Sequence, residues 1–153
     1  MKIHRLERSQ CLPVTLAEAW AFFVDPCNLC LITPPDLGFA ITSPVPSRTY
    51  PGLVITYTVT PFAGIPVRWV TEITHAEEPR FFVDEQRFGP YRFWHHQHLF
   101  REVTGGVEMD DIVHYGLPFG LLGGIAAPLV ARRLASIFDF RRTVLADRFG
   151  TMD

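Results

Sequence analysis

Two histidines separated by a single residue, His96 and His98, are the side chains of this sequence best suited to chemistry. They lie in a run rich in aromatic and β-branched residues, which is typical of a β-strand, and positions two residues apart on a strand share one face. Asp84 and Asp111, in the two neighbouring runs, can reach the same face. Two imidazoles and one carboxylate form a donor set for a transition metal. A histidine held by an aspartate beside a phenol can instead act as a general acid or base.

Three strands must position these side chains, and glycine-bearing breaks separate the strands. Gly89-Pro90 and Gly105-Gly106 divide residues 81–115 into three runs and predict two successive β-hairpins. We expect a three-residue turn over residues 89–91 and a two-residue turn at Gly105-Gly106. A slip of one residue at either turn would move a strand's whole set of side chains to the other face.

The two expected turns set which residues lie opposite one another. The first turn places Asp84 opposite His96, and the second places His96 opposite Tyr115. The predicted cross-strand row is therefore Asp84–His96–Tyr115, with His98 and Asp111 as diagonal neighbours on the same face.

The face that carries this row is otherwise mostly apolar, whereas the opposite face is charged. A strand expected at 67–75 extends it, because pairing Ile73 with Phe82 places Trp69 beside Gln86. An apolar surface with a few convergent polar groups is typical of a ligand pocket. The candidate ligand-binding residues are Trp69, Asp84, Gln86, Trp94, His96, His98, Phe100, Asp111 and Tyr115 on the strands, and Arg141 nearer the C-terminus.

Arg141 lies within the apolar stripe of a long helix expected over residues 126–149. From there its guanidinium can pair with Asp111 or Asp84, extend to the mouth of a cavity, or bind an anionic group of a ligand. Pro128 is compatible only with the first turn of this helix or with a kink.

The remaining elements are expected to form one sheet around that helix. A first strand at 2–11 precedes two short helices, one opened by the capping-box spacing of Thr15 and Glu18 and one by Asp25-Pro26. Further strands are expected at 38–43, 52–60 and 67–75, and rim loops at 43–51, 61–66 and 116–124. This order predicts an α+β fold, a curved antiparallel meander wrapped around a long C-terminal helix.

Length and composition narrow the function classes. A chain of 153 residues with 48% hydrophobic and 20% charged residues suits a single globular domain spanning 1–153. A net charge of −2 offers no basic footprint, so nucleic acid is not expected as a partner. No run approaches the ~20 apolar residues of a membrane span, and the first ten residues lack a secretory h-region. We therefore expect a cytoplasmic protein whose three cysteines, Cys11, Cys27 and Cys30, are buried, reduced thiols.

Five segments of the sequence resemble the helix-grip (START-like, Bet v 1-like) superfamily, specifically its bacterial polyketide cyclase/dehydrase-type ligand-binding proteins. They are FVDPCNLCLITPP at 23–35, GIPVRWVTEI at 64–73, DEQRFGPYRFWHHQHLF at 84–100, MDDIVHYGLPFG at 109–120 and IFDFR at 137–141. The resemblance covers essentially the whole chain. It implies a hydrophobic ligand held in a tunnel between the sheet and the last helix, and it assigns no catalytic residue.

The leading hypothesis is a protein that binds a small hydrophobic or aromatic molecule between the sheet and the C-terminal helix. No cofactor, metal or oligomeric state is predicted, and the histidines are expected to be held by the aspartates in a hydrogen-bonded network. One alternative is a cyclase/dehydratase-type or metal-dependent enzyme that uses Asp84, His96, His98, Asp111 and Tyr115. Another is an accessory module that binds a partner protein through loop 116–124, and this alternative predicts a narrow or filled cavity.

Overall fold

The computed structural model describes residues 1–61, 64–118 and 120–152, and their side chains except those of 120–124. In chain order the elements are β1 (Ile3–Leu12), α1 (Leu16–Phe23), the 3-10 helices η1 (Pro26–Cys30) and η2 (Pro35–Leu37), β2 (Ala40–Ile41), β3 (Val54–Val59), β4 (Val67–Glu77), β5 (Phe81–Phe88), β6 (Phe93–Val103), β7 (Gly106–Gly116) and α2 (Gly120–Phe149).

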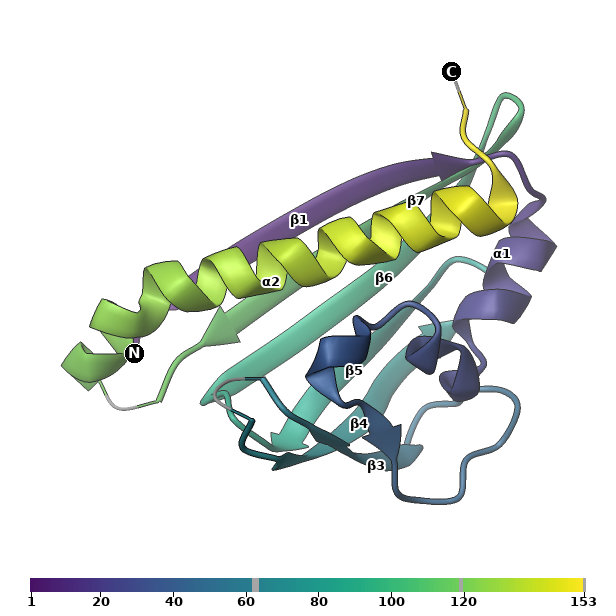
Figure 1. Ribbon diagram of the computed structural model, residues 1–153. Helices are drawn as coiled ribbons and strands as arrows, with labels where there is room; N and C mark the ends of the chain where they lie inside the picture. Colours follow the sequence, from purple (N-terminus) through teal and green to yellow (C-terminus); the bar gives the residue numbers. More distant parts are fainter. Residues whose placement is uncertain (62–63, 119, 153) are drawn as a thin grey trace.

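The strands form one antiparallel sheet in the order β1-β7-β6-β5-β4-β3-β2. The sheet curves around α2, which runs along its length, as Figure 1 shows. The predicted α+β helix-grip architecture is therefore confirmed. The meander holds from β2 to β7, and β1 joins it by pairing with β7. No helix among the described residues has the length and apolarity that crossing a bilayer requires.

Local signals in the sequence account for the short helices after β1. Thr15 and Glu18 form the predicted capping box, in which the Thr15 side chain accepts from the Glu18 amide and the Glu18 side chain accepts from the Thr15 amide. The carboxylate of Asp25 accepts from the Cys27 amide at 2.9 Å and starts the second helix, as predicted. That second helix is a 3-10 helix, and a further one, η2, follows it. The expected burial of the cysteines is wrong for the two in this helix, since Cys27 and Cys30 are exposed free thiols.

The long helix starts earlier than the sequence indicated. It begins at Gly120 rather than near residue 126, so Pro128 lies inside it and not in its first turn. The predicted rim loop 116–124 therefore shrinks to the few residues before the helix, and its residue 119 lies outside the described part of the chain. Further along, the buried stripe of α2 faces the sheet with Val130, Leu134, Phe138, Arg141 and Leu145.

The β6–β7 hairpin differs in register from the prediction. Val103 pairs with Gly106, so the two-residue turn is Thr104-Gly105 rather than Gly105-Gly106. Gly105 supplies the positive φ of +87° that such a turn requires. The predicted pairing is therefore wrong by two residues. Because two is the period of a strand, every side chain still lies on its predicted face.

The remaining registers decide which site residues become neighbours. The β5–β6 register is confirmed, with Asp84 opposite His96. The predicted pairing of Ile73 with Phe82 is wrong, since Ile73 lies opposite Asp84 and Thr71 opposite Gln86. The offset is already set at the turn, where Glu77 pairs with Phe81, and the irregularity between Ile73 and His75 then brings Ile73 opposite Asp84.

Candidate functional site

A cavity of about 510 Å³ lies between the concave face of the sheet, α2 and the short helices. The backbone of α2 approaches β1 more closely than it approaches the other strands, which leaves room over β3 to β6. The walls are mostly apolar and aromatic. They include Phe39, Tyr57, Trp69, Trp94, Val130 and Phe138.

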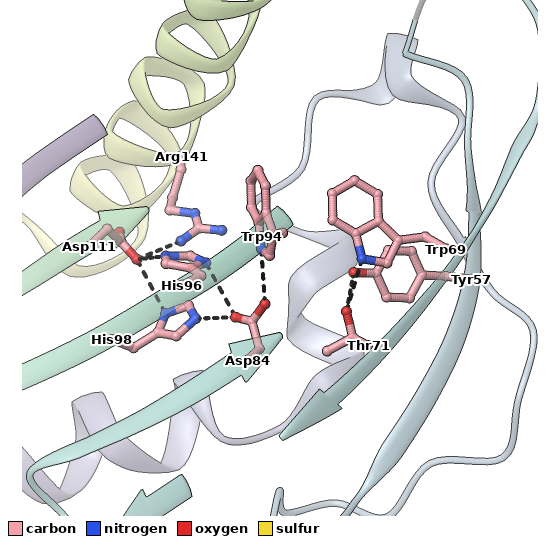
Figure 2. Close-up of polar contacts among 9 residues, drawn as sticks. All are labelled: Tyr57, Trp69, Thr71, Asp84, Trp94, His96, His98, Asp111 and Arg141. Carbon is pink, nitrogen blue, oxygen red and sulfur yellow. Dashed lines mark hydrogen bonds and ion pairs between the residues drawn. The ribbon is translucent and has the colours of Figure 1, made fainter. Parts of the chain in front are cut away.

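A cluster of two histidines and two aspartates forms one polar part of the cavity region, as Figure 2 shows. His96 Nε2 lies 2.8 Å from Asp111 Oδ1, and His98 Nε2 lies 2.8 Å from Asp84 Oδ2. The other ring nitrogens also face carboxylates, with His96 Nδ1 at 3.3 Å from Asp84 Oδ2 and His98 Nδ1 at 3.2 Å from Asp111 Oδ1. The two imidazole rings are close neighbours, with 3.8 Å between their centroids and an angle of 39° between their planes. Each histidine thus bridges both aspartates.

Two further side chains hold the aspartates in place. Arg141 Nη1 donates to Asp111 Oδ1 at 3.0 Å, which is one of the pairings expected from the sequence. The guanidinium also lies over the Phe138 ring, 4.7 Å from its centroid. On the other side, Trp94 Nε1 donates to Asp84 Oδ1 at 3.2 Å. The cluster is therefore tied to α2 at one end and to the cavity wall at the other.

The charges of the cluster determine the protonation of its members. Burial disfavours the ionised form of each carboxyl group. The charge of His96 at Asp84, the charge of Arg141 at Asp111 and the hydrogen bonds from both histidines together outweigh burial and lower both pKa values. Burial likewise disfavours the charged form of His96, yet the Asp84 and Asp111 carboxylates raise its pKa above the usual value. Both aspartates are therefore anionic, and His96 favours the protonated form.

Six of the ten candidate residues line the cavity, namely Trp69, Asp84, Trp94, His96, His98 and Arg141. Asp111 lies behind the two histidines and is not part of the wall. Phe100 belongs to the core, where its ring contacts Trp20, Phe23 and Phe82.

Gln86 and Tyr115 have roles other than the ones expected for them. The side-chain amide of Gln86 donates to the Tyr91 carbonyl and accepts from the Tyr91 amide, which fastens the β5–β6 turn. Tyr115 pairs with Trp94 and stacks on His4, with 5.2 Å between ring centroids. The predicted row Asp84–His96–Tyr115 is therefore wrong beyond His96, because the two-residue shift in register places Asp111 opposite His98 and Val113 opposite His96.

A second polar group on the cavity wall did not emerge from the sequence. Thr71 Oγ1 accepts from Trp69 Nε1 at 3.0 Å and lies 2.9 Å from the Tyr57 hydroxyl (Figure 2). All three side chains line the cavity. The signal was present, since Tyr57 and Thr71 are polar residues on otherwise apolar strand faces, but their contact depends on the pairing of β3 with β4.

One of the two hydroxyl hydrogens of the Tyr57–Thr71 pair is not used in the hydrogen bond between them. Two hydroxyl groups carry two hydrogens, and only one of them is used in the bond between the two oxygens. No other acceptor within the described residues is hydrogen-bonded to either hydroxyl. The pair therefore offers one hydrogen-bond donor at the cavity wall, whichever oxygen accepts within the pair.

Burial of Tyr57 predicts a pH effect. Burial, and then the nearby Asp84 carboxylate, raise the pKa of the Tyr57 phenol far above its usual value of about 10. The native protein therefore keeps Tyr57 protonated, and its contribution to stability is full below about pH 10 and is lost as the pH rises beyond it, because the unfolded chain ionises first.

Tyrosinate absorbance measures this effect directly. Between about pH 9 and pH 11 the native protein and its Tyr57→Phe variant are expected to show the same absorbance change, because Tyr57 stays protonated. In urea the variant should show one tyrosinate fewer than the wild type. A native variant that lacks one tyrosinate in this pH range would contradict the burial of the phenol.

Comparison with known proteins supports the fold. No protein-family model matches the sequence, and no curated protein sequence matches it. Among solved structures the chain is similar to protein Ms6760 from Mycobacterium smegmatis, with 17% identity, a TM-score of 0.65 and coverage of 97% of this chain and 98% of the other. Protein CV1439 from Chromobacterium violaceum has 13% identity, a TM-score of 0.68 and 98% coverage of both chains.

The structure of Ara h 8.0201, of the Bet v 1 family, is similar as well. Its identity is 17% and its TM-score 0.65, with coverage of 95% of this chain and 99% of the other. A sheet that grips a long C-terminal helix defines the helix-grip class of proteins. Within that class, the present chain has the Bet v 1-like fold. At these identities the likeness concerns the fold alone.

Proposed function

We propose that this protein binds a small hydrophobic or aromatic molecule in the cavity between the sheet and α2. The observation that carries the proposal is the 510 Å³ cavity, which is mostly apolar and has polar groups at two separate places on its wall. Cavities of roughly 300–1,000 Å³ with this composition are typical of small-molecule sites. The Bet v 1-like fold supports a ligand-binding role in general.

The polar and aromatic groups on the cavity wall restrict the chemical class of the ligand. The hydroxyl hydrogen of the Tyr57–Thr71 pair requires an acceptor, so the ligand carries a carbonyl, ether or phenolic oxygen. Trp69 and Trp94 meet edge to face, with 5.2 Å between their ring centroids, and provide a surface for an aromatic ring. The cluster around His96 and His98 adds polar anchors beside Trp94.

Capture of a ligand from a cell extract tests the proposal. Purified protein is incubated with the extract, re-isolated, and examined by native mass spectrometry for a bound small molecule. Trp94→Ala and His96→Ala are expected to lose the bound molecule, whereas His95→Ala, on the outer face of the same strand, should retain it. Equal retention in all three variants would refute the proposed site.

The hydroxyl donor makes a sharper prediction for any captured ligand. In Tyr57→Phe the Thr71 hydroxyl still has a free hydrogen, and in Thr71→Val the Tyr57 hydroxyl does, so each single variant keeps a donor. Only the double variant lacks it, and a lost hydrogen bond of about 1.4 kcal/mol weakens binding about tenfold. Calorimetric titration is expected to show a larger loss than the two single variants predict together, and strictly additive losses would argue against a shared donor.

The alternative functions differ in their support. A filled cavity was expected for an accessory module that binds through the segment before α2, so the open cavity weighs against it. Polyketide cyclase/dehydrase-type catalysis gains support from His96, which lines the cavity and has a raised pKa, as a general acid needs. A captured ligand that His96→Ala binds but no longer converts would establish catalysis.

A further inference from the structure

When both histidines are neutral, the histidine–aspartate cluster has fewer N–H donors than contacts between a ring nitrogen and a carboxylate oxygen. All four ring nitrogens of His96 and His98 lie 2.8–3.3 Å from a carboxylate oxygen. Two neutral imidazoles carry two N–H groups, so two nitrogen lone pairs would point at anionic oxygens. The Nδ1 atom of His98 is indeed buried without a hydrogen bond. A cation between Asp84 and the two ring nitrogens that face it would satisfy the two contacts that neutral rings leave without a hydrogen.

Protonating both rings would meet the shortage at a high electrostatic cost. The two imidazole rings are only 3.8 Å apart, so two imidazolium charges would repel each other in a buried site. The two aspartates and Arg141 together carry a net charge of −1, which favours a cation nearby. One divalent ion supplies the same charge as two protons from a single centre, and both rings bind it as neutral imidazoles, so that its binding releases the proton of His96.

We propose that Asp84, His96 and His98 bind a divalent transition-metal ion whose open coordination position faces the cavity. The three ligand atoms lie within 4.8 Å of one another. Asp84 Oδ2 is 2.8 Å from His98 Nε2 and 3.3 Å from His96 Nδ1. Ligand atoms about 2.1 Å from one ion are roughly 3.0–3.4 Å apart in tetrahedral or octahedral geometry, so the Asp84 oxygen already lies close to the required distance from each nitrogen.

The surroundings distinguish the two ends of the cluster. At the Asp111 end, the Arg141 guanidinium already binds Oδ1, and a second cation there would be repelled. Asp84, His96 and His98 line the cavity, whereas Asp111 does not. The ion therefore lies at the Asp84 end, where three protein ligands leave room for a further ligand from the cavity.

Asp111 then becomes the partner that orients both metal-binding rings. With the ion on His96 Nδ1 and His98 Nε2, the protons lie on His96 Nε2 and His98 Nδ1, and both donate to Asp111 Oδ1. A carboxylate behind metal-bound histidines fixes their tautomers and raises their basicity. Trp94 completes the arrangement by donating to the other oxygen of Asp84. Each ring nitrogen of His96 and His98 then either binds the ion or donates its hydrogen to Asp111. Two imidazoles and one carboxylate favour Zn²⁺, Co²⁺ or Fe²⁺ over Mg²⁺ or Ca²⁺.

Titration of the metal-free protein with Zn²⁺ tests the proposal. The full chain is freed of metal with a chelator, and Zn²⁺ binding is measured by calorimetry and by elemental analysis after desalting. We expect one equivalent of Zn²⁺, and at least a hundredfold weaker binding in Asp84→Asn and in His98→Ala. Asp111→Asn should weaken binding about 10–100-fold, as expected for a residue that only orients the ligands. Bound Co²⁺ should give the visible bands of a nitrogen- and oxygen-ligated ion, which the Asp84→Asn variant lacks.

The outer face of the sheet provides the control. His95 and His114 lie opposite each other on β6 and β7, with 6.4 Å between ring centroids, and can bind Zn²⁺ at the surface. The His95→Ala/His114→Ala variant is expected to keep the full equivalent. Loss of Zn²⁺ in that variant would mean an adventitious ion only and would overturn the proposal. Wild-type protein that binds no more Zn²⁺ than Asp84→Asn, with both folded by near-ultraviolet circular dichroism, would overturn it equally. Ligand capture by the metal-free protein tests the proposed function separately.

Discussion

The Asp111→Ala variant is expected to be about 3–5 kcal/mol less stable than the wild type, which is the usual cost of removing one partner of a buried ion pair. Asp111 is only 3% exposed, and it is the acceptor for the 7% exposed Arg141 and for His96. Its loss would leave the guanidinium as a buried charge beside the Phe138 ring. The Nε atom of Arg141 is already buried without a hydrogen bond. No hydrogen bond from Nε therefore offsets the loss of the one to Asp111.

Urea denaturation of the metal-free variant measures this loss, with Asp110→Ala as the control. Asp110 is the next residue on the same strand, but it lies on the outer face, where most substitutions change stability by less than about 0.5 kcal/mol. Replacing the pair together, as Asp111→Leu/Arg141→Met, should recover most of the loss because no unpaired charge is left buried. An Asp111→Ala variant as stable as Asp110→Ala would contradict the buried ion pair.

The inner face of the sheet could be predicted because it depends only on the alternation of a strand. Successive side chains point to opposite faces, so His96 and His98 had to share a face, and Asp84 joined them through the first hairpin. The apolar stripe of α2 likewise placed Arg141 under the sheet. These relations hold under any register shift of two residues. The polar cluster was therefore predicted as a set, although not with its correct pairings.

The pairings themselves depend on turns, whose geometry the sequence does not determine. Gly105-Gly106 fits a two-residue turn at either of two positions, and the two registers differ by two residues. The choice decided whether Tyr115 or Val113 lies opposite His96, and whether Asp111 lies opposite His98. The Tyr57–Thr71 contact was missed for a similar reason, since it forms across the β3–β4 pair.

Cavity and core also look alike in a sequence, because both require apolar side chains. Phe100 and Trp94 occupy the same face of β6, yet the first packs against Trp20 and Phe23 and the second lines the cavity. What separates them is where α1 and α2 approach the sheet. That distance follows from tertiary packing rather than from any local pattern.

The Gly106→Ala variant is expected to lose about 3 kcal/mol or more, at the upper end of the cost of overpacking. A Cβ atom at Gly106 would lie 2.1 Å from the carbonyl oxygen of Leu12, far inside van der Waals contact. That carbonyl cannot yield easily, because it accepts from the Val14 amide at 2.9 Å in the connection to α1. Leu12 is fully buried as well. The clash must therefore displace the end of β1 or of β7.

Gly116→Ala, at the other end of the same strand, is the matched control. Its added Cβ would meet the thioether of Met1, the far end of a flexible and exposed side chain that can move away. We expect a change of less than about 1 kcal/mol there, measured by thermal and urea unfolding of both variants. The two glycines of the β6–β7 connection thus serve different purposes: Gly105 supplies a positive φ in the turn, and Gly106 lets the backbone of β1 approach. Equal stability of the Gly106→Ala and Gly116→Ala variants would contradict this close approach of β1 to β7 at Leu12.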